Sequence, residues 1–397
     1  MKTGSKNRRL RLVIVGMMGR CPFGGQTWLY LNWLQAFSRL GHDVYYVEDD
    51  TVWPYDPEKN AVTEDCGYAV RHISGCLQRI GLAGHWAFRL ADRKGACWGM
   101  SSEQLNQLYR SCDALLNVCG ATDLRQEHMA APLRIYVETD PVTAELRLTM
   151  GDEHTRVAFG SHDLIVTYGE NYGAPDCGVP LNGLDSKYRK TRQPIDLDLW
   201  PMVFDPGAPY ITTIGNYRQQ GGDVLYRGET YRWSKHHEWE RFIGLPSRTA
   251  QPFQVAMMPD DIEDRTRLEG HGWRLVPPLK MSLDIFGAYP DFFRRSRAEF
   301  TVAKDQNIRL RSGWFSERDA CYLASGKPVI AQDTGFSNIL PTGEGLFAFQ
   351  TMEEVLVAID AINGDYERQC TRARAIASEF FDAEAVGRKF LADVGLG

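Results

Sequence analysis

The sequence contains no Cys-x-x-Cys pair, no long apolar run and no excess of positive charge. Its nine cysteines, scattered over 397 residues, favour reduced thiols in a cytoplasmic protein and argue against a disulfide framework or structural zinc. The apolar stretch at 12–15 is too short to span a membrane. A glycine-rich turn follows it where a signal peptide would have its cleavage site, so we expect no secretion signal and no membrane span.

Charge and composition exclude further classes of protein. The formal net charge of −6 gives no cationic field for general nucleic-acid or anionic-membrane binding, so any anion site must be local. Hydrophobic residues at 43% and charged residues at 24% are typical of a globular protein and unlike a disordered or fibrous one. The length is about twice that of a usual domain, which predicts two domains.

The first half of the chain alternates strands and helices. A glycine-rich loop at 17–25 separates the first strand from a helix at 26–40. The later strands are each followed by Gly, Asp-Pro or Gly-Glu. This alternation is typical of a parallel, doubly wound sheet. The predicted strands are 11–16, 43–48, 114–118, 134–137 and 164–168.

Prolines and basic residues interrupt this pattern near residue 200, and a second series of strands and helices follows. The last thirty residues lack a strand pattern, and Arg372, Ile376 and Phe380 recur at the spacing of one helix face. The two halves therefore have similar predicted architectures. The predicted units are an N-terminal domain at 1–190, a linker at 191–209, a C-terminal domain at 210–375 and a helical segment at 376–397 that caps or crosses between the domains.

Each half offers a candidate anion site. In an open parallel sheet, ligands bind beyond the carboxyl ends of the strands, where helix N-termini present free N–H groups to a phosphate. In the first half, Gly24 and Gly25 allow close backbone approach just before the helix. In the second half the loop 304–315 precedes a helix, and Ser316 and Asp319 have the spacing of a capping box at its start.

Basic residues favour the second place. Between residues 294 and 318, seven basic residues stand against three acidic ones, a contrast that suits a diphosphate. The three arginines within 294–297 are more simply interpreted as a solvated helix face. For Lys304, Arg309 and Arg318, which border the strand end and the helix start, a solvated face and a phosphate contact are equal alternatives.

A polar turn follows the next predicted strand, at 328–331. It consists of Asp333, Thr334 and Gly335, and the glycine permits an exposed backbone turn. The Asp and Thr side chains could hold a sugar hydroxyl or a phosphate oxygen. An Asx-type turn that starts the following helix is an equal alternative.

Three motifs follow one another in the second half: GWFSER at 313–318, LASGKPVIAQDTGF at 323–336 and GEGL at 343–346. Through them the stretch 297–362 resembles the donor half of GT-B glycosyltransferases. The resemblance implies an α/β fold with two Rossmann-like domains facing across a cleft. It also implies a nucleotide-diphospho-sugar as co-substrate, held mainly by the C-terminal domain, and an acceptor held mainly by the N-terminal domain.

The resemblance extends the donor site over both domains. Gly24 and Gly25 would approach the diphosphate from the N-terminal domain, and the turn at 215–216 would line the cleft. Lys235 would stabilise the departing diphosphate without an obligatory metal, although a surface lysine packed on a neighbouring tryptophan is an equal alternative. Arg318→Ala is expected to weaken donor binding far more than folding. The predicted donor-binding residues are Gly24, Gly25, Gly215, Asn216, Lys235, Lys304, Arg309, Ser316, Glu317, Arg318, Asp333, Thr334 and Gly335.

The motifs also depart from the family pattern. Retaining members often carry two glutamates eight residues apart, and the corresponding positions here are Gly313 and Cys321. The ribose and sugar contacts of those glutamates would then pass to other groups, such as Glu317, Asp319 or Asp333, or the pocket would be built differently. The resemblance therefore leaves the stereochemical outcome open.

An inverting transfer needs a general base that faces the anomeric carbon, commonly Asp, Glu or His. The candidates all follow predicted strands of the N-terminal half. They are Asp123, Glu138 and Asp140, with Glu170 as a further one, and none stands out. Asp140 precedes a proline and is equally expected to begin a turn.

Other functions fit less well. A dinucleotide-dependent oxidoreductase would need the motif G-x-G-x-x-G, and the glycines between 16 and 25 do not have that spacing. A metal-dependent sugar transferase would use an Asp-x-Asp motif at a strand end, but the Asp-x-Asp at 196–198 lies in the predicted linker. A nucleotide-sugar epimerase or hydrolase, or a catalytically silent binding subunit, would keep the fold and stays open. The best interpretation is a cytoplasmic glycosyltransferase that moves a sugar from a nucleotide-diphosphate-sugar to an acceptor hydroxyl, without an obligatory metal.

Overall fold

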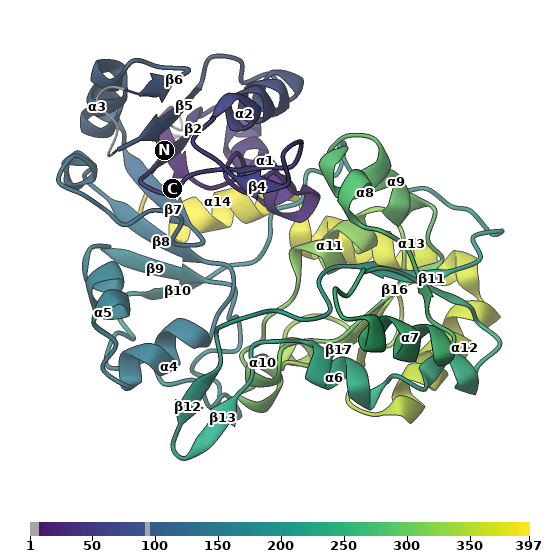
Figure 1. Cartoon of the computed structure of the whole chain (residues 1–397). Coiled ribbons are helices and arrows are strands. Elements are labelled where there is room, and N and C mark those ends of the chain that lie inside the picture. The colour runs from purple at the N-terminus through teal and green to yellow at the C-terminus, as the bar shows by residue number, and fades with distance from the viewer. Residues whose placement is uncertain (1–7, 92–95) are drawn as a thin grey trace, which may run out of the picture.

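The computed structural model describes residues 8–91 and 96–397. It forms two lobes, each built on a sheet flanked by helices (Figure 1). Within the described residues the first sheet has the strand order β10-β9-β8-β7-β1-β2-β5-β6 and is parallel except for β6, which runs antiparallel to β5. Its strands are β1 (Arg11–Val15), β2 (Asp43–Asp50), β5 (Trp86–Leu90), β6 (Cys97–Trp98), β7 (Ala114–Val118), β8 (Arg134–Glu138), β9 (Leu164–Thr167) and β10 (Tyr188–Lys190).

The central strands of this sheet are buried on both faces. All five residues of β7 are buried, as are four of the five in β1, because helices cover both sides of a parallel sheet and its strands are mainly apolar. The covering elements and a small hairpin are α1 (Gly24–Arg39), α2 (Gly67–Arg79), α3 (Ser102–Ser111), α4 (Thr143–Thr149), α5 (Glu153–Gly160), the 3-10 turn His128–Ala130, β3 (Tyr55–Asp56) and β4 (Ala61–Val62).

The second sheet has the order β15-β14-β11-β16-β17-β18, and all neighbouring strands in it run parallel. A hairpin inserted after its first strand reaches toward α4 of the other lobe (Figure 1). The strands are β11 (Ile211–Ile214), β12 (Val224–Tyr226), β13 (Glu229–Tyr231), β14 (Phe253–Ala256), β15 (Arg274–Leu275), β16 (Ala298–Thr301), β17 (Val329–Gln332) and β18 (Leu346–Phe349). The helices are α6 (His236–Arg241), α7 (Ile262–Gly270), α8 (Leu279–Leu283), α9 (Ala288–Arg294), α10 (Asp305–Arg309), α11 (Glu317–Ala324), α12 (Met352–Gly364) and α13 (Tyr366–Ile376), with 3-10 turns at Leu245–Arg248 and Phe336–Asn338.

The end of the chain crosses back to the first lobe. A π-helical turn, Ala377–Phe381, leads into α14 (Ala383–Asp393), which lies against α1 (Figure 1). The ring of Phe390 packs on Trp33 and Phe37 of α1, with centroid distances of 5.0 and 5.6 Å. None of the helices in the described part of the chain has the length and apolar character that a bilayer crossing requires.

Helix α1 begins two residues before the predicted start, so Gly24 and Gly25 form its first turn instead of the preceding loop. The reason is contact with the other lobe. A Cβ atom at Gly24 would lie 2.4 Å from the ring of Tyr289 in α9, and the Gly24 N–H donates to Ser282 Oγ of α8 at 3.0 Å. The missing side chain at Gly24 therefore allows α1 to pack closely on the second lobe.

We predict that Phe390→Ala lowers the free energy of unfolding by about 3–5 kcal/mol, because it empties a buried aromatic site between α14 and α1. The neighbouring Lys389→Ala removes only an exposed ion pair with Asp393 and should cost less than about 1 kcal/mol. Urea unfolding of both variants checks this. Equal midpoints for the two would show that α14 contributes nothing to the stability of the first lobe.

Candidate functional site

A small pocket of about 70 Å³ lies at the carboxyl end of β11. It is lined by the glycine turn Gly215-Asn216, by Lys235 just before α6, and by Arg318 in the first turn of α11. The structure therefore brings together four of the predicted donor-binding residues from three separate segments. This is the place where ligands bind in an open parallel sheet.

Arg318 is held by protein groups on all sides. Its guanidinium donates to the Glu299 carboxylate, to the Ile214 carbonyl oxygen at 2.8 Å and to Thr301 Oγ1 at 2.7 Å. Burial alone would lower the pKa of Arg318, but the carboxylates of Glu299 and Asp319 raise it. The charge is thus compensated inside the second lobe, and a structural role of Arg318 is as well supported as a donor contact.

Lys235 lacks such compensation. In the described residues no carboxylate lies within ion-pair distance of its ammonium group, which sits 5.1 Å from the ring centroid of Trp314. Burial, together with the nearby Arg318 and Lys304, lowers the pKa of Lys235 to about 7, and Asp319 and Asp140 only partly oppose this shift. A half-buried cation without an anionic partner is a natural contact for an anionic ligand.

The start of α11 differs in detail from the predicted capping box. Ser316 is the N-cap, but its Oγ accepts from the Arg318 N–H at 3.2 Å instead of the Asp319 N–H. The Asp319 side chain is buried beside Glu299, and burial raises the pKa of both groups. It therefore belongs to the charge cluster around Arg318, whereas a capping-box acid would bond the N-cap backbone.

Glu317 lies between the two lobes. Its Oε1 accepts a hydrogen bond from Asn32 Nδ2 of α1 at 2.7 Å, and burial raises the pKa of Glu317 to about 8. The side chain is therefore largely protonated at neutral pH. It joins α11 to α1 and is not among the residues that line the small pocket.

Other predicted donor-binding residues are placed elsewhere. Arg309 pairs with Glu229, and its guanidinium lies 4.1 Å from the ring centroid of Tyr231, so it faces the β12–β13 hairpin. The N–H of Gly335, with φ of +96°, donates to Asp333 Oδ1 at 2.9 Å, which is the Asx-type turn. Thr334 Oγ1 donates to the Trp314 carbonyl oxygen. Of the two interpretations of this turn, the structure therefore contains the Asx turn.

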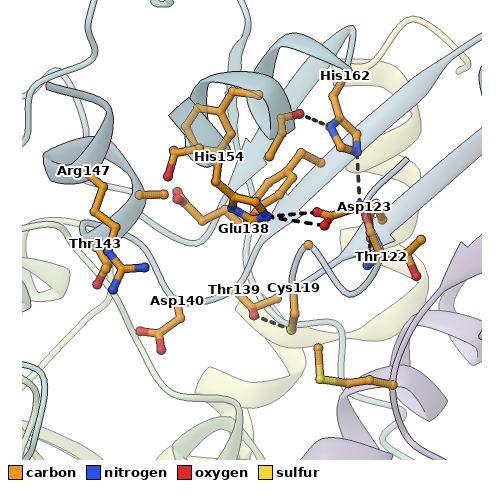
Figure 2. Close-up of a pocket in the computed structure, with 18 of the residues that line it drawn as sticks. Cys119, Thr122, Asp123, Glu138, Thr139, Asp140, Thr143, Arg147, His154 and His162 are labelled. Carbon is orange, nitrogen blue, oxygen red and sulfur yellow. Dashed lines mark hydrogen bonds and ion pairs between the residues drawn. The ribbon is translucent and has the colours of Figure 1, made fainter. Parts of the chain in front are cut away.

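A much larger cavity, of about 570 Å³, lies at the carboxyl ends of β7 and β8 in the first lobe (Figure 2). Helices α1, α4 and α5 contribute to its wall, and Trp233 reaches it from the second lobe. The volume is that of a site for a small-molecule ligand. All three leading candidates for the general base line it, namely Asp123, Glu138 and Asp140.

The three carboxyl groups have different surroundings. Asp123 is exposed and lies 3.2 Å from His154 Nε2 of α5. Glu138 is buried, and burial and then the neighbouring Glu145 raise its pKa well above the usual range. Its Oε2 accepts a hydrogen bond from Thr167 Oγ1 at 2.6 Å inside the first lobe. Asp140 forms an ion pair with Lys304 of the second lobe.

The turn after Asp140 is strained. Val142 has φ of +91°, a conformation that a β-branched residue rarely adopts. Its N–H donates to Glu145 Oε2 and to Tyr172 Oη, both at 2.9 Å. Strain of this kind persists only where surrounding contacts impose it, and it is common at functional sites.

Several cavity residues were missed by sequence reasoning. Arg147 of α4 points toward Thr143 and Asp140 (Figure 2), and no hydrogen bond or ion pair of its guanidinium is found within the described chain. Burial lowers the pKa of His162 to about 4, so its ring is neutral. The available signal was the position of α4, because a helix that follows a parallel strand starts beside the carboxyl ends. The other missed polar residues are Asn117, Cys119, Thr122, Thr139 and His154.

The comparisons with known proteins bear on the fold. No protein-family model and no curated protein sequence matches the chain. An alpha-glucosyltransferase solved with UDP-glucose and DNA containing an abasic site is 10% identical, with a TM-score of 0.59 over 98% of this chain and 100% of its own. HepE of Anabaena, solved with UDP and glucose, is 12% identical, with a TM-score of 0.58 over 98% and 100%.

A third similar structure is the sucrose-phosphate synthase of Thermosynechococcus elongatus, which is 13% identical with a TM-score of 0.55 over 96% of this chain and 97% of its own. These similarities confirm the predicted fold: the chain has the two-domain α/β architecture of GT-B glycosyltransferases. Sequence identities this low carry no information about substrates.

We predict that Arg318→Met lowers the free energy of unfolding by about 3 kcal/mol, because it leaves the buried Glu299 carboxylate without its partner. The double variant with Glu299→Leu should recover at least half of that loss, since the carboxyl group that bonds Arg318 most closely is then gone and only Asp319 remains. Chemical denaturation of wild type and the three variants checks this. If Arg318→Met were as stable as wild type, Arg318 would be free to bind a ligand, which is the phosphate contact that the sequence analysis gave as one of two alternatives.

Proposed function

We propose that this chain is a metal-independent glycosyltransferase that transfers a sugar from a nucleotide-diphosphate-sugar to an acceptor hydroxyl. The observation that carries the proposal is Lys235 in the pocket at the end of β11, without an ion-pair partner among residues 8–91 and 96–397, within the GT-B fold. The proposed donor-binding domain is 210–375, and the proposed acceptor-side domain is 1–190. The neighbours solved with UDP or UDP-glucose make UDP the first nucleotide to test.

In the proposed reaction the bond between the anomeric carbon and the donor phosphate breaks, and negative charge grows on the departing diphosphate. Lys235 stabilises that charge, as an oriented cation does in a partly desolvated site. The glycine turn at 215–216 lets the phosphates approach the backbone. Nothing in this step requires a side chain that is already engaged elsewhere, as Arg309 is with Glu229.

On the acceptor side, Asp140 is our preferred general base for an inverting transfer. Glu138 is buried and its Oε2 is engaged by Thr167 Oγ1, and Asp123 is exposed at the cavity wall beside His154. Asp140 stands at the end of β8, where the large cavity meets the second lobe. It would remove the acceptor proton while the sugar is transferred.

The large cavity favours a transferase over the alternatives. An epimerase or hydrolase acting on the nucleotide-sugar needs room for water or the sugar alone, whereas about 570 Å³ beside the donor pocket accommodates a separate acceptor. One neighbour was solved with DNA, but the net charge of −6 gives this chain no general attraction for nucleic acid.

The proposal is tested by incubating the full chain with UDP-glucose and with panels of mono- and disaccharide acceptors. Release of UDP that depends on an acceptor supports transfer. Conversion of the sugar without an acceptor would identify an epimerase or hydrolase, and binding without turnover a silent subunit. Absence of binding for every nucleoside diphosphate and nucleotide-sugar in a thermal-shift panel would overturn the proposal.

We predict that Lys235→Met weakens UDP binding about ten- to a hundredfold, the effect of losing one charge-assisted contact of roughly 1.5–3 kcal/mol. Titration calorimetry of the full chain measures the affinity. Arg295→Met is the matched control, because Arg295 is an exposed cation on the same lobe and should leave the affinity unchanged. Equal losses in both variants would indicate a general charge effect without a Lys235 contact.

We also predict that UDP binds less tightly as the pH rises above about 7. In the free protein the pKa of Lys235 is about 7, and a bound diphosphate favours the protonated form and raises that pKa. Binding above pH 7 therefore takes up a proton, and affinity falls until the pH reaches the pKa of the complex. Calorimetry in buffers of different ionisation enthalpy measures this uptake, which Lys235→Met should abolish.

A further inference from the structure

Three contacts from the second lobe converge on the segment 139–143 of the first. Lys304 pairs with Asp140, Gln306 Nε2 donates to Thr143 Oγ1 at 2.6 Å, and Trp314 Nε1 donates to the Thr139 carbonyl oxygen at 3.0 Å. All three hydrogen-bond donors come after β16 in the sequence, and the segment 139–143 that they bind comes after β8. The carboxyl ends of the two sheets are therefore tied together at the wall of the large cavity, which Thr139, Asp140 and Thr143 line.

The two partners of the Lys304–Asp140 ion pair differ in burial, because the lysine is buried and the aspartate is partly exposed. The Lys304 side chain is 5% exposed and its ammonium group lies over the ring of Trp233. A cation so buried needs an anion, because the ring alone does not replace its hydration. Asp140 supplies one carboxylate oxygen to it, and its other oxygen is buried without a hydrogen-bond partner in the part of the chain that the structure describes.

The same lysine is close enough to the donor pocket to affect it. Trp233, over whose ring the Lys304 ammonium lies, is two residues before Lys235, and the Lys235 ammonium lies over Trp314, which bonds the same segment 139–143. Lys304 and Asp140 also act electrostatically on Lys235, in opposite directions. A diphosphate bound at Lys235 would therefore attract the Lys304 ammonium as well. The bound phosphate and the Asp140 carboxylate then compete for the Lys304 ammonium group. A stronger contact of Lys304 with the phosphate therefore weakens its contact with Asp140.

We propose that Asp140 occupies, in the ligand-free protein, the anion position on Lys304 that a donor phosphate takes, so that donor binding releases Asp140 to the large cavity. Lys304 is then a positioning residue that couples the two substrates. Before the donor binds, the carboxylate is masked; afterwards it is free to accept a proton from an acceptor hydroxyl. This inference rests on the proposed function, because it requires a diphosphate donor.

The test is UDP binding by titration calorimetry to the full chain. Asp140→Asn should tighten UDP binding about fivefold or more, a coupling of ordinary size, because it removes the competing anion. Lys304→Met should weaken it. In the Lys304→Met background the Asp140→Asn change should have no further effect, which is the signature of a direct competition.

Asp176→Asn is the matched control. Asp176 also forms an ion pair across the lobes, with Arg311 at 2.7 Å, and its side-chain exposure of 40% matches the 37% of Asp140. It lines neither cavity. Its removal should therefore leave UDP affinity unchanged, whereas tighter binding in this variant would mean that any loosening of the two lobes suffices, and the proposal would be wrong.

The outcomes separate the inference from the proposed function. If wild type binds neither UDP nor any other nucleoside diphosphate, the proposed function fails. If wild type binds UDP but Asp140→Asn binds it equally or more weakly, the lysine and carboxylate form a structural tie and the inference is overturned. Should Asp140→Asn fail to fold, Asp140→Ser and the Lys304→Met affinity decide, and an unchanged affinity in Lys304→Met also overturns it.

Discussion

Three cations of the second lobe act on one another near the cleft between the lobes, and each one is compensated differently. Arg318 is paired within its own lobe with Glu299. Lys304 is paired with Asp140 from the opposite lobe, and we propose that a donor phosphate exchanges with that carboxylate. Within the described residues Lys235 has no carboxylate at ion-pair distance, and its pKa falls to about 7. A lysine in this position is costly to keep charged without an anion, and in the proposed function the donor diphosphate supplies it.

The backbone places these charges where they meet. In both sheets the polar segments follow the carboxyl ends of the strands, and the lobes turn those ends toward each other through α1 and the segment 139–143. Helix α14 returns to the first lobe and packs on α1, which is also the helix that contacts α8 and α9 of the second. A change in the relative position of the lobes would therefore first alter the contacts of α1 with the second lobe and the Asp140–Lys304 ion pair.

Much of the fold could be predicted because it depends on local pattern. Buried strands such as β17 are short, mainly apolar runs, and the helix α11, followed by Gly326, can be predicted from spacing alone. The site could be predicted only in part. One pocket does contain the turn at 215–216, Lys235 and Arg318. Arg309 instead faces the β12–β13 hairpin, and the turn at Asp333 is closed by its own Asx hydrogen bond.

The order of residues was enough to predict an α/β chain in two halves and to place candidate anion-binding groups at strand ends. It did not establish which charge pairs with which. Lys304 and Asp140 are 164 residues apart, and for Arg318 the sequence left a phosphate contact and a solvated face as equal alternatives, without the buried pair with Glu299. Periodicity is a property of neighbouring residues, but the partner of a buried charge is chosen by packing between distant segments, so only the folded arrangement distinguished the paired arginine from Lys235.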